Sequence, residues 1–188
     1  MVAGRPMIEV EVKSRVDDIR EFRRRLREAG ARRLDEVVEK DVYYSHPCRD
    51  FARTDEALRI RVSRKEASLT YKGPKLDASS KSREEMVLPL TGPDGPAKAG
   101  AMLEKLGFRR VAWVRKKRRV YSLGRFEVCL DRVEGLGDYA EVEAMAPKKG
   151  YERIRNEALA LLERLGGGKP ERRSYLELLL LKRGRRRL

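Results

Sequence analysis

The chain has 188 residues, of which 40% are hydrophobic and 40% charged, and its formal net charge is +15. This length suits one domain with its own core, and the hydrophobic content excludes a disordered chain. One histidine and two cysteines argue against a histidine-based zinc centre, a Ser-His-Asp triad and a disulfide framework. No apolar segment suits a signal peptide or a membrane span, so we expect a soluble, cytoplasmic protein. The lack of Gln and a single Asn are typical of thermophilic composition.

The first half of the chain is predicted to be rich in strands. Residues 8–13 alternate apolar and charged side chains, which predicts a strand with one apolar and one charged face. A helix follows over residues 17–27, because the acidic pair at its start suits a helix N-terminus and Gly30 suits its end. Further strands are expected at residues 36–45, 57–64, 67–73 and 83–90, with a loop at residues 46–55 and a polar connection at residues 75–81.

The second half repeats this alternation of helix and strands. A breaker cluster at residues 91–96 leads into a second helix that ends near Gly107. A third helix is expected from about residue 149 to residue 165, and a glycine-rich linker separates it from a short apolar segment. We interpret residues 1–181 as a single domain and residues 182–188 as a basic tail. The remaining expected elements are strands at residues 112–123, 125–133 and 138–145, turns at Gly124 and residues 134–137, and the apolar segment at residues 175–181.

Charged side chains recur two residues apart, and therefore on one face, in several of these strands. Complementary charges on the faces of several strands predict a sheet closed around a charged interior. About eight strands in a mainly antiparallel order suffice to close a barrel with room for one small ligand. We therefore expect an α+β fold, an eight-stranded, mainly antiparallel β-barrel or tunnel with a charged lumen and flanking helices. The charged pairs are Glu9 with Glu11, Arg59 with Arg61, and Glu141 with Glu143.

The acidic residues of this interior predict a metal site. Two facing pairs of carboxylates repel each other unless divalent cations lie between them. Oxygen ligands without Cys or His favour Mg²⁺ or Mn²⁺. For any one pair, an ordinary solvated strand face is the alternative. The candidate metal ligands are Glu9, Glu11, Asp131, Glu141 and Glu143.

The basic residues of the interior predict phosphate binding. Guanidinium groups bind phosphate oxygens bidentately, and lysines add point charge. The chain contains no P-loop and no dinucleotide fingerprint, so side chains would have to hold the phosphates. Only one face of the basic run at residues 115–119 can line a lumen, and the alternative is that the run coats the outside. The candidate phosphate ligands are Lys13, Arg59, Arg61, Lys72, Arg83, Lys116 and Arg118.

The residues Glu9-Val10-Glu11-Val12-Lys13 match the Glu-x-Glu-x-Lys signature of the CYTH superfamily. This superfamily joins class IV adenylyl cyclases with thiamine and inorganic triphosphatases. The chain resembles it over nearly its whole length, and the resemblance guided the choice of Lys116 and Arg118 within the basic run. Residues 51–61 and 134–137 look closest to the class IV cyclase branch. The other supporting motifs are residues 41–44, 54–61, 69–75, 82–85, 127–131 and 141–143.

The resemblance implies an antiparallel tunnel that binds a triphosphate with Mg²⁺ or Mn²⁺. It implies that Glu9, Glu11, Glu141 and Glu143 hold metal with help from Asp131, that the seven basic residues bind phosphates, and that Lys13 and Asp131 serve catalysis. The favoured reaction is that of a class IV adenylyl cyclase, which converts ATP to cyclic AMP and pyrophosphate. The alternative is hydrolysis of inorganic, thiamine or nucleoside triphosphate.

A third interpretation is a binder of polyphosphate or nucleic acid without turnover. The aromatic residues show no pattern of a base-stacking platform, so nucleic acid would bind only through the basic tail. The sequence predicts no membrane partner and leaves a homodimer open. It does not identify the nucleophile.

Overall fold

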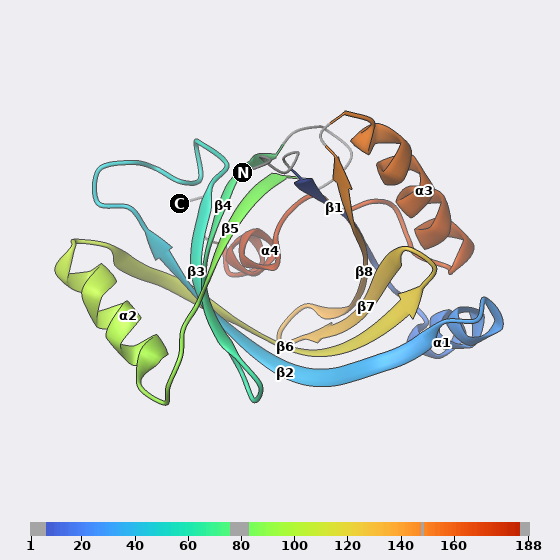
Figure 1. Ribbon diagram of the computed structural model, residues 1–188, viewed down its shortest axis with the longest axis horizontal. Coiled ribbons are helices and arrows are strands. Elements are labelled where there is room, and N and C mark those ends of the chain that lie inside the picture. Colours follow the sequence, from blue (N-terminus) through green and yellow to red (C-terminus); the bar gives the residue numbers. More distant parts are fainter. Residues whose placement is uncertain (1–6, 76–82, 148, 185–188) are drawn as a thin grey trace, which may run out of the picture.

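Eight strands close into one barrel with four helices around it in the computed structural model, which describes residues 7–75, 83–147 and 149–184 (Figure 1). The predicted α+β fold, an eight-stranded barrel with flanking helices, is confirmed. The strands are β1 (Met7–Arg15), β2 (Arg32–Ser45), β3 (Ala57–Ser63), β4 (Ala67–Lys75), β5 (Arg83–Pro89), β6 (Arg109–Leu123), β7 (Phe126–Val133) and β8 (Gly137–Pro147). The helices are α1 (Ile19–Glu28), α2 (Gly95–Lys105), α3 (Tyr151–Arg164) and α4 (Tyr175–Lys182).

The strands follow the order β1-β5-β4-β3-β2-β6-β7-β8 around the barrel, and every neighbouring pair is antiparallel. β1 therefore lies between the last strand and β5. The ladder between β1 and β8 runs over the whole of β1, from Met7 to Arg15. By contrast, the ladder between β1 and β5 consists of the single pair Glu9 and Arg83 among the described residues.

Most of the hydrophobic core lies outside the barrel, between its wall and the helices. Val10 and Val12 of β1 are almost completely buried, and they point away from the lumen because they alternate with the charged residues of that strand. Val12 packs in a cluster with Phe22 of α1 and Leu162 of α3. Asp18 caps α1, where its side chain accepts hydrogen bonds from two backbone N–H groups of the first turn. The apolar half of the alternation predicted for residues 8–13 thus faces the helices.

The helix α4 closes one end of the tunnel (Figure 1). Tyr175 and Leu179 of this helix pack among residues that share the lumen-facing side of their strands with the charged residues further in. A capping box begins the helix, because the Ser174 side chain accepts from the backbone of Glu177 and the Glu177 side chain accepts from the backbone of Ser174. The residues that meet α4 in this cluster are Tyr43, Val114, Val133 and Tyr139.

Several predicted boundaries differ from the observed ones. β2 begins at Arg32 rather than at residue 36, because a bulge between Arg33 and Asp35 breaks the alternation but preserves the pairing with β6. The segment 175–181, predicted only as apolar, is helical. Residues 76–81 of the predicted polar connection and 185–188 of the predicted tail lie outside the described residues.

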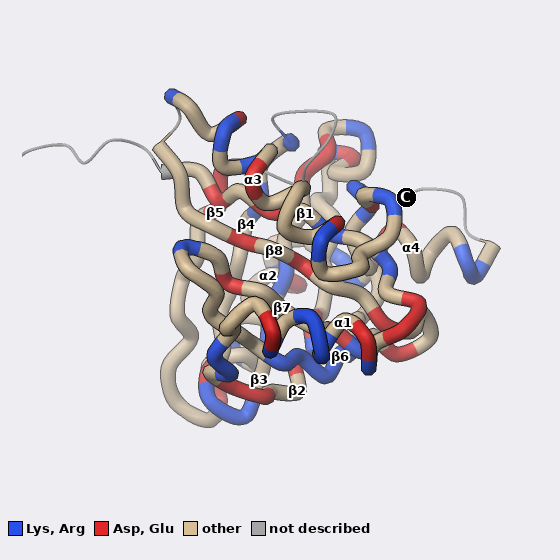
Figure 2. The backbone as a smooth tube through the Cα atoms, turned by 90° about the vertical axis from the view of Figure 1, so that its right-hand side faces the viewer, with Lys and Arg blue, Asp and Glu red and all other residues tan. Residues whose placement is uncertain are grey.

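The charged residues are spread over the molecule. In Figure 2, short acidic and basic stretches are scattered among uncharged ones, and neither sign occupies a side alone. None of the helices within the described ranges has the length and apolar run required to cross a bilayer.

Candidate active site

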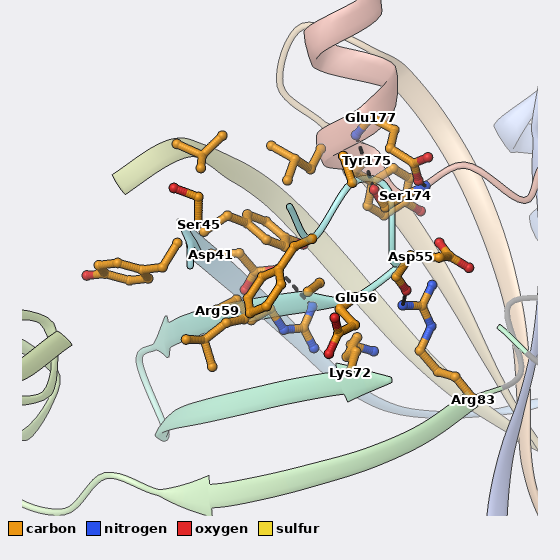
Figure 3. Close-up of a pocket in the computed structure, with 18 of the residues that line it drawn as sticks. Asp41, Ser45, Asp55, Glu56, Arg59, Lys72, Arg83, Ser174, Tyr175 and Glu177 are labelled. Carbon is orange, nitrogen blue, oxygen red and sulfur yellow. Dashed lines mark hydrogen bonds and ion pairs between the residues drawn. The ribbon is translucent and has the colours of Figure 1, made fainter. Parts of the chain in front are cut away.

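The barrel encloses a cavity of about 550 Å³. Residues of β1, β2, β3, β4, β5, β6, β8 and α4 line it, together with the loop between β2 and β3. Figure 3 shows Arg59, Lys72 and Arg83 around the inside of this cavity, with Tyr175 and Glu177 of α4 above them. The size is within the range of about 300 to 1,000 Å³ that is typical of small-molecule sites.

Three carboxylates of β1 and β8 meet in the cavity. Glu11 lies directly opposite Glu143 in the ladder between these strands. Glu11, Glu141 and Glu143 each offer one oxygen, and these oxygens all lie within 4.8 Å of one another. Burial raises the pKa of Glu143 to about 8, with Glu11 and Glu141 adding to the effect against the opposing charge of Arg118. Buried carboxylates this close favour a divalent cation between them, and an all-oxygen set suits Mg²⁺ or Mn²⁺.

Glu9 lies apart from this group, although it also lines the cavity. Its side chain shares a hydrogen bond with Glu85 of β5. Burial, with a further contribution from Glu85, raises the pKa of Glu9 to about 7 against the opposing charge of Lys72. The structure therefore places Glu9 beside a second acidic residue that the sequence prediction did not include.

Arg59 and Arg61 of β3 point to Asp41 of β2. Arg61 binds it in a fork, with Nε 2.7 Å from Oδ1 and Nη2 2.9 Å from Oδ2, while Arg59 Nη1 donates to Oδ2 over 3.1 Å. Burial alone would raise the pKa of Asp41, but the two guanidinium groups hold it well below its usual range. Within the described chain, Arg59 Nε is buried and has no hydrogen-bond partner. The Arg59 side chain also lines the cavity.

Lys116 and Arg118 of β6 converge on Asp131 of β7. Arg118 Nε and Nη2 lie 2.8 and 2.7 Å from the two oxygens of Asp131, and Lys116 Nζ lies 3.1 Å from Oδ2. Arg118 also contacts Glu141, and its Nη1 lies 3.5 Å from Glu143. The Asp131 side chain is completely buried and is outside the set of described residues that line the cavity. It therefore holds the two cations in place, and Arg118 links it to Glu141.

The remaining phosphate candidates of the opposite wall are Lys72 and Arg83. Lys72 pairs with Glu85, and burial together with Arg59 lowers the pKa of this lysine. Arg83 is buried and donates from Nη1 to the backbone oxygen of Gly73 over 3.1 Å. Both side chains line the cavity.

Lys13 lies under α4 rather than among the residues described as lining the cavity. Its side chain is almost completely buried, and Nζ donates to the backbone oxygen of Arg173. The ammonium also lies 4.1 Å from the centre of the Tyr175 ring, a favourable cation–π distance. The third residue of the Glu-x-Glu-x-Lys signature therefore contacts the cap of the tunnel.

The sequence prediction missed the acidic partners of the lumen cations. Glu39 Oε2 lies 3.0 Å from Arg61 and 3.3 Å from Lys116, and Asp41 and Glu85 hold the other cations described above. The sequence contains a signal for these residues, which is the two-residue spacing that places side chains on one face of a strand. Glu39 and Asp41 have this spacing, as do Arg83 and Glu85. A second group was also missed, in which ligand atoms of Glu127, Cys129 and Glu143 all lie within 4.8 Å of one another.

The three close carboxylates and most of the lumen cations belong to different strands of one cavity, and ion pairs such as Arg118 with Glu141 join the two groups. The three close carboxylates come from β1 and β8, and most of the cations come from β3, β4, β5 and β6. Such a division can hold a divalent cation on one side of an anionic ligand and neutralise the rest of its charge from the other. A polyphosphate has the required shape and charge.

The comparisons with known proteins extend over nearly the whole chain. The family model described as CYTH domain matches residues 7–175. A relative from Methanocaldococcus jannaschii, provisionally named an adenylate cyclase, is 37% identical over 175 residues, which make up 92% of this chain and 98% of the relative. Adenylate cyclase CyaB of Aeromonas hydrophila is 31% identical over 176 residues, or 90% of this chain and 87% of that protein. The solved structure of a Pyrococcus horikoshii OT3 protein has a TM-score of 0.86 at 41% identity and covers 93% of this chain and 99% of its own.

Proposed function

The chain belongs to the CYTH domain family, and from this premise we propose that it is a metal-dependent enzyme acting on a triphosphate in its tunnel. The reaction we favour is that of a class IV adenylyl cyclase, in which ATP gives cyclic AMP and pyrophosphate. The names of the relatives from M. jannaschii and A. hydrophila support this choice. The observation that carries the proposal is the close group of Glu11, Glu141 and Glu143 in the same cavity as the cations of the opposite wall.

Glu11, Glu141 and Glu143 would hold Mg²⁺ or Mn²⁺, and Glu9, which lines the same cavity beside Glu85, is a further candidate ligand. When bound, the ion would neutralise phosphate charge and orient the phosphates. The chain's own cations would neutralise the remaining phosphate charge. Arg59, whose side chain lines the cavity, would bind phosphate oxygens directly.

Arg118 and Lys116 would stabilise the negative charge that develops on the leaving pyrophosphate. Asp131 acts on this step through them, because it fixes both cations in the lumen before a substrate arrives. We therefore assign Asp131 a positioning role in place of direct metal binding. Arg61, Lys72 and Arg83 complete the cationic wall along the phosphate chain.

In the cyclase reaction, the ribose 3′-hydroxyl attacks the α-phosphorus and must lose its proton. Lys13 is our candidate for orienting this hydroxyl. Its ammonium is held by the Arg173 carbonyl under α4, so this role requires the contact to be released.

The second candidate is hydrolysis of the triphosphate, in which water attacks the terminal phosphorus. The position of Lys13 favours hydrolysis. Lys13 is held under α4, away from the carboxylates of the cavity, and hydrolysis does not need it to orient a ribose hydroxyl. The same metal ligands and the same cations would serve both reactions.

The two candidates differ in their products. We would incubate the pure protein with ATP, thiamine triphosphate and tripolyphosphate, each with Mg²⁺ or Mn²⁺, and identify the products by mass spectrometry. Cyclic AMP and pyrophosphate establish the cyclase, whereas orthophosphate without a cyclic product establishes the hydrolase. Failure to turn over any of the three would reject the enzyme proposal and favour a binding protein. The exposed Glu28 of α1 provides a matched control, since Glu28→Gln should preserve a turnover that Glu11→Gln abolishes.

We also propose that the protein works in the cytoplasm, because both cysteines are free. Any contact with nucleic acid is assigned to the basic tail. Truncation after Leu181 should then reduce polyanion binding and preserve triphosphate turnover.

A further inference from the structure

A second cavity, of about 330 Å³, lies at the rim of the barrel. The last turn of α4 meets β6 and the turn between β7 and β8 there. None of the described residues lines both this rim cavity and the tunnel, so the function proposed above does not account for it. Its size is at the lower end of the range that is typical of small-molecule sites. The side chains that line it are Trp113, Arg115, Glu134, Leu179, Lys182 and Arg183.

The rim cavity carries an excess of positive charge, because its lining has three cationic side chains and one acidic side chain. Arg115 Nη1 lies 3.7 Å from Glu134, and both side chains are more than half exposed, so water weakens this pair. Lys182 Nζ donates to the backbone oxygen of Gly135 over 2.7 Å, a contact that leaves its charge uncompensated. Within the described part of the chain, neither Lys182 nor Arg183 has a carboxylate partner. An anionic ligand would supply the missing negative charge.

The rim cavity also has an apolar surface. Leu179 of α4 is buried, and Trp113 of β6, the only tryptophan of the chain, is 42% exposed. Trp113 and Arg115 are two residues apart on β6, so both project from the outer face of this strand. The indole ring lines the cavity, so part of its surface is open to a ligand. Apolar surface of this kind gains free energy when a planar ring stacks on it and excludes water.

Cations beside an exposed indole suit a small ligand that has both an anionic group and a planar ring. Guanidinium and ammonium groups bind phosphate oxygens well, and three cations match the charge of a phosphate dianion. Inorganic phosphate would leave the indole without a partner. A long polyanion would extend far beyond a cavity of this size. The chemistry of the lining therefore favours a ring with a single phosphate group.

We propose that the rim cavity binds a small organic phosphate with a planar ring, the chemistry of a nucleoside monophosphate, at a site separate from the tunnel. The ligand would join the last turn of α4 to the turn between β7 and β8, as the contact of Lys182 with Gly135 does. The first turn of the same helix carries Tyr175, whose hydroxyl lies 3.0 Å from Asp131. A bound ligand would therefore hold in place the helix that closes the tunnel. The inference goes beyond the proposed function and does not depend on it.

The test uses Trp113 as a reporter, because the fluorescence of a protein with one tryptophan comes from a known position. We would titrate the unmodified protein with AMP, adenosine and inorganic phosphate and follow the tryptophan emission. Two variants are compared with it. Arg183→Ala removes an exposed cation of the rim cavity, and Lys117→Ala removes the same charge from the outer face of β6 at a residue that does not line it. Both positions are at the surface, so both variants should fold.

We expect AMP to change the emission saturably and to bind more tightly than adenosine or phosphate, since each of these lacks one half of the contacts. Arg183→Ala should weaken AMP binding by about 10-fold, as for the loss of one charged hydrogen bond, and Lys117→Ala should leave it unchanged.

The absence of any response to AMP would overturn the inference. A response that Arg183→Ala leaves unchanged would place AMP elsewhere, and an equal loss in both variants would indicate a general effect of charge, so either result also overturns it. Equal affinities for AMP and phosphate would do the same, because the indole would then have no role. The experiment requires no turnover, so its result is independent of the proposed reaction.

Discussion

In one strand of this barrel, β6, the surroundings of a cationic side chain depend on the face of the strand from which it projects. Residues 115–119 are five consecutive cations of β6, and the alternation of the strand divides them between two surroundings. The side chains of Lys116 and Arg118 are 3% and 9% exposed in the lumen, whereas those of Arg115 and Lys117 are 59% and 47% exposed on the outside. The residue types are the same, so the difference in role comes from the face of the strand alone.

The inner and the outer cations of β6 differ in their ion-pair partners and in the free energy of desolvation on folding. On the outside, Lys117 and Arg119 both pair with Glu36, where water screens the pairs. In the lumen, Lys116 and Arg118 are desolvated, which opposes folding, and the Asp131 carboxylate offsets this cost. The inner cations are therefore fixed before any substrate arrives, and the outer ones contribute mainly to solubility. Four substitutions test this contrast.

We expect the largest effect from removal of the inner anion. Asp131→Asn leaves Arg118 and Lys116 buried without their shared charge, and loss of one partner of a buried pair costs about 3 to 5 kcal/mol. Urea denaturation should show this loss, while Asp138→Asn, which affects the outer pair with Arg132, should cost a small fraction of it. Equal losses for the two variants would mean that the lumen is as well solvated as the surface.

The next largest effect is expected on the metal site. Glu11→Gln removes one of the three close carboxylates, and turnover should fall by more than about 100-fold, since even an outer-shell partner of a metal ligand is worth about 10- to 100-fold. Calorimetry should show that Mn²⁺ binding is lost at the same time. Normal Mn²⁺ affinity in this variant would contradict the assignment of the site.

An intermediate effect is expected from the cations themselves. Arg118→Ala removes a charged hydrogen-bond donor worth about 1.5 to 3 kcal/mol to a phosphate, so the KM for the triphosphate should rise by about 10- to 100-fold. Arg119→Ala, one residue further along and on the outer face, should leave KM unchanged. If steady-state kinetics showed similar KM values for both variants, the inner face would have no special role in phosphate binding.

The smallest effect is expected at Glu36 and depends on pH. Lys117 and Arg119 lower the pKa of Glu36 to about 2 from its ordinary value of 4.5. A lowered carboxyl pKa stabilises the fold above pH 4.5, and this contribution is lost as the pH falls towards 2. Thermal melts of the unmodified protein and Glu36→Gln should therefore differ slightly at pH 7 and converge near pH 2. A difference that grew on acidification would show that Glu36 acts in another way.

Much of the contrast between inner and outer faces could be predicted from the sequence, because the alternation of side chains depends only on the residues of one strand. The spacing of Glu9, Glu11 and Lys13 defines one face of β1, and the same rule divides residues 115–119. The closed barrel also followed from charged faces that recur on several strands. Two acidic pairs on different strands indicated a metal site, and the structure brings Glu11, Glu141 and Glu143 together.

The partners across the lumen could not be predicted in the same way. Which carboxylate meets which cation depends on the register between strands, and Glu39 lies opposite Lys116, far away in the sequence. A bulge between Arg33 and Asp35 shifts that register, and a shift of one residue would turn each side chain to the other face. The position of Lys13 depends on α4, a segment whose sequence indicated only that it was apolar. Tertiary packing decides these features.

Among the described residues, β1 and β5 share the single pair of Glu9 and Arg83, which is the shortest ladder of the wall. Since antiparallel strands alternate the direction of their backbone groups, the N–H groups of Glu85 and Val87 point away from β4 and towards this junction. Hydrogen–deuterium exchange of these amides would report on local opening at this junction. Glu9 and Arg83 are also cavity residues, so a bound triphosphate bridging them would slow this labelling. The exchange rate of β5 is thus a reporter of occupancy that requires no turnover.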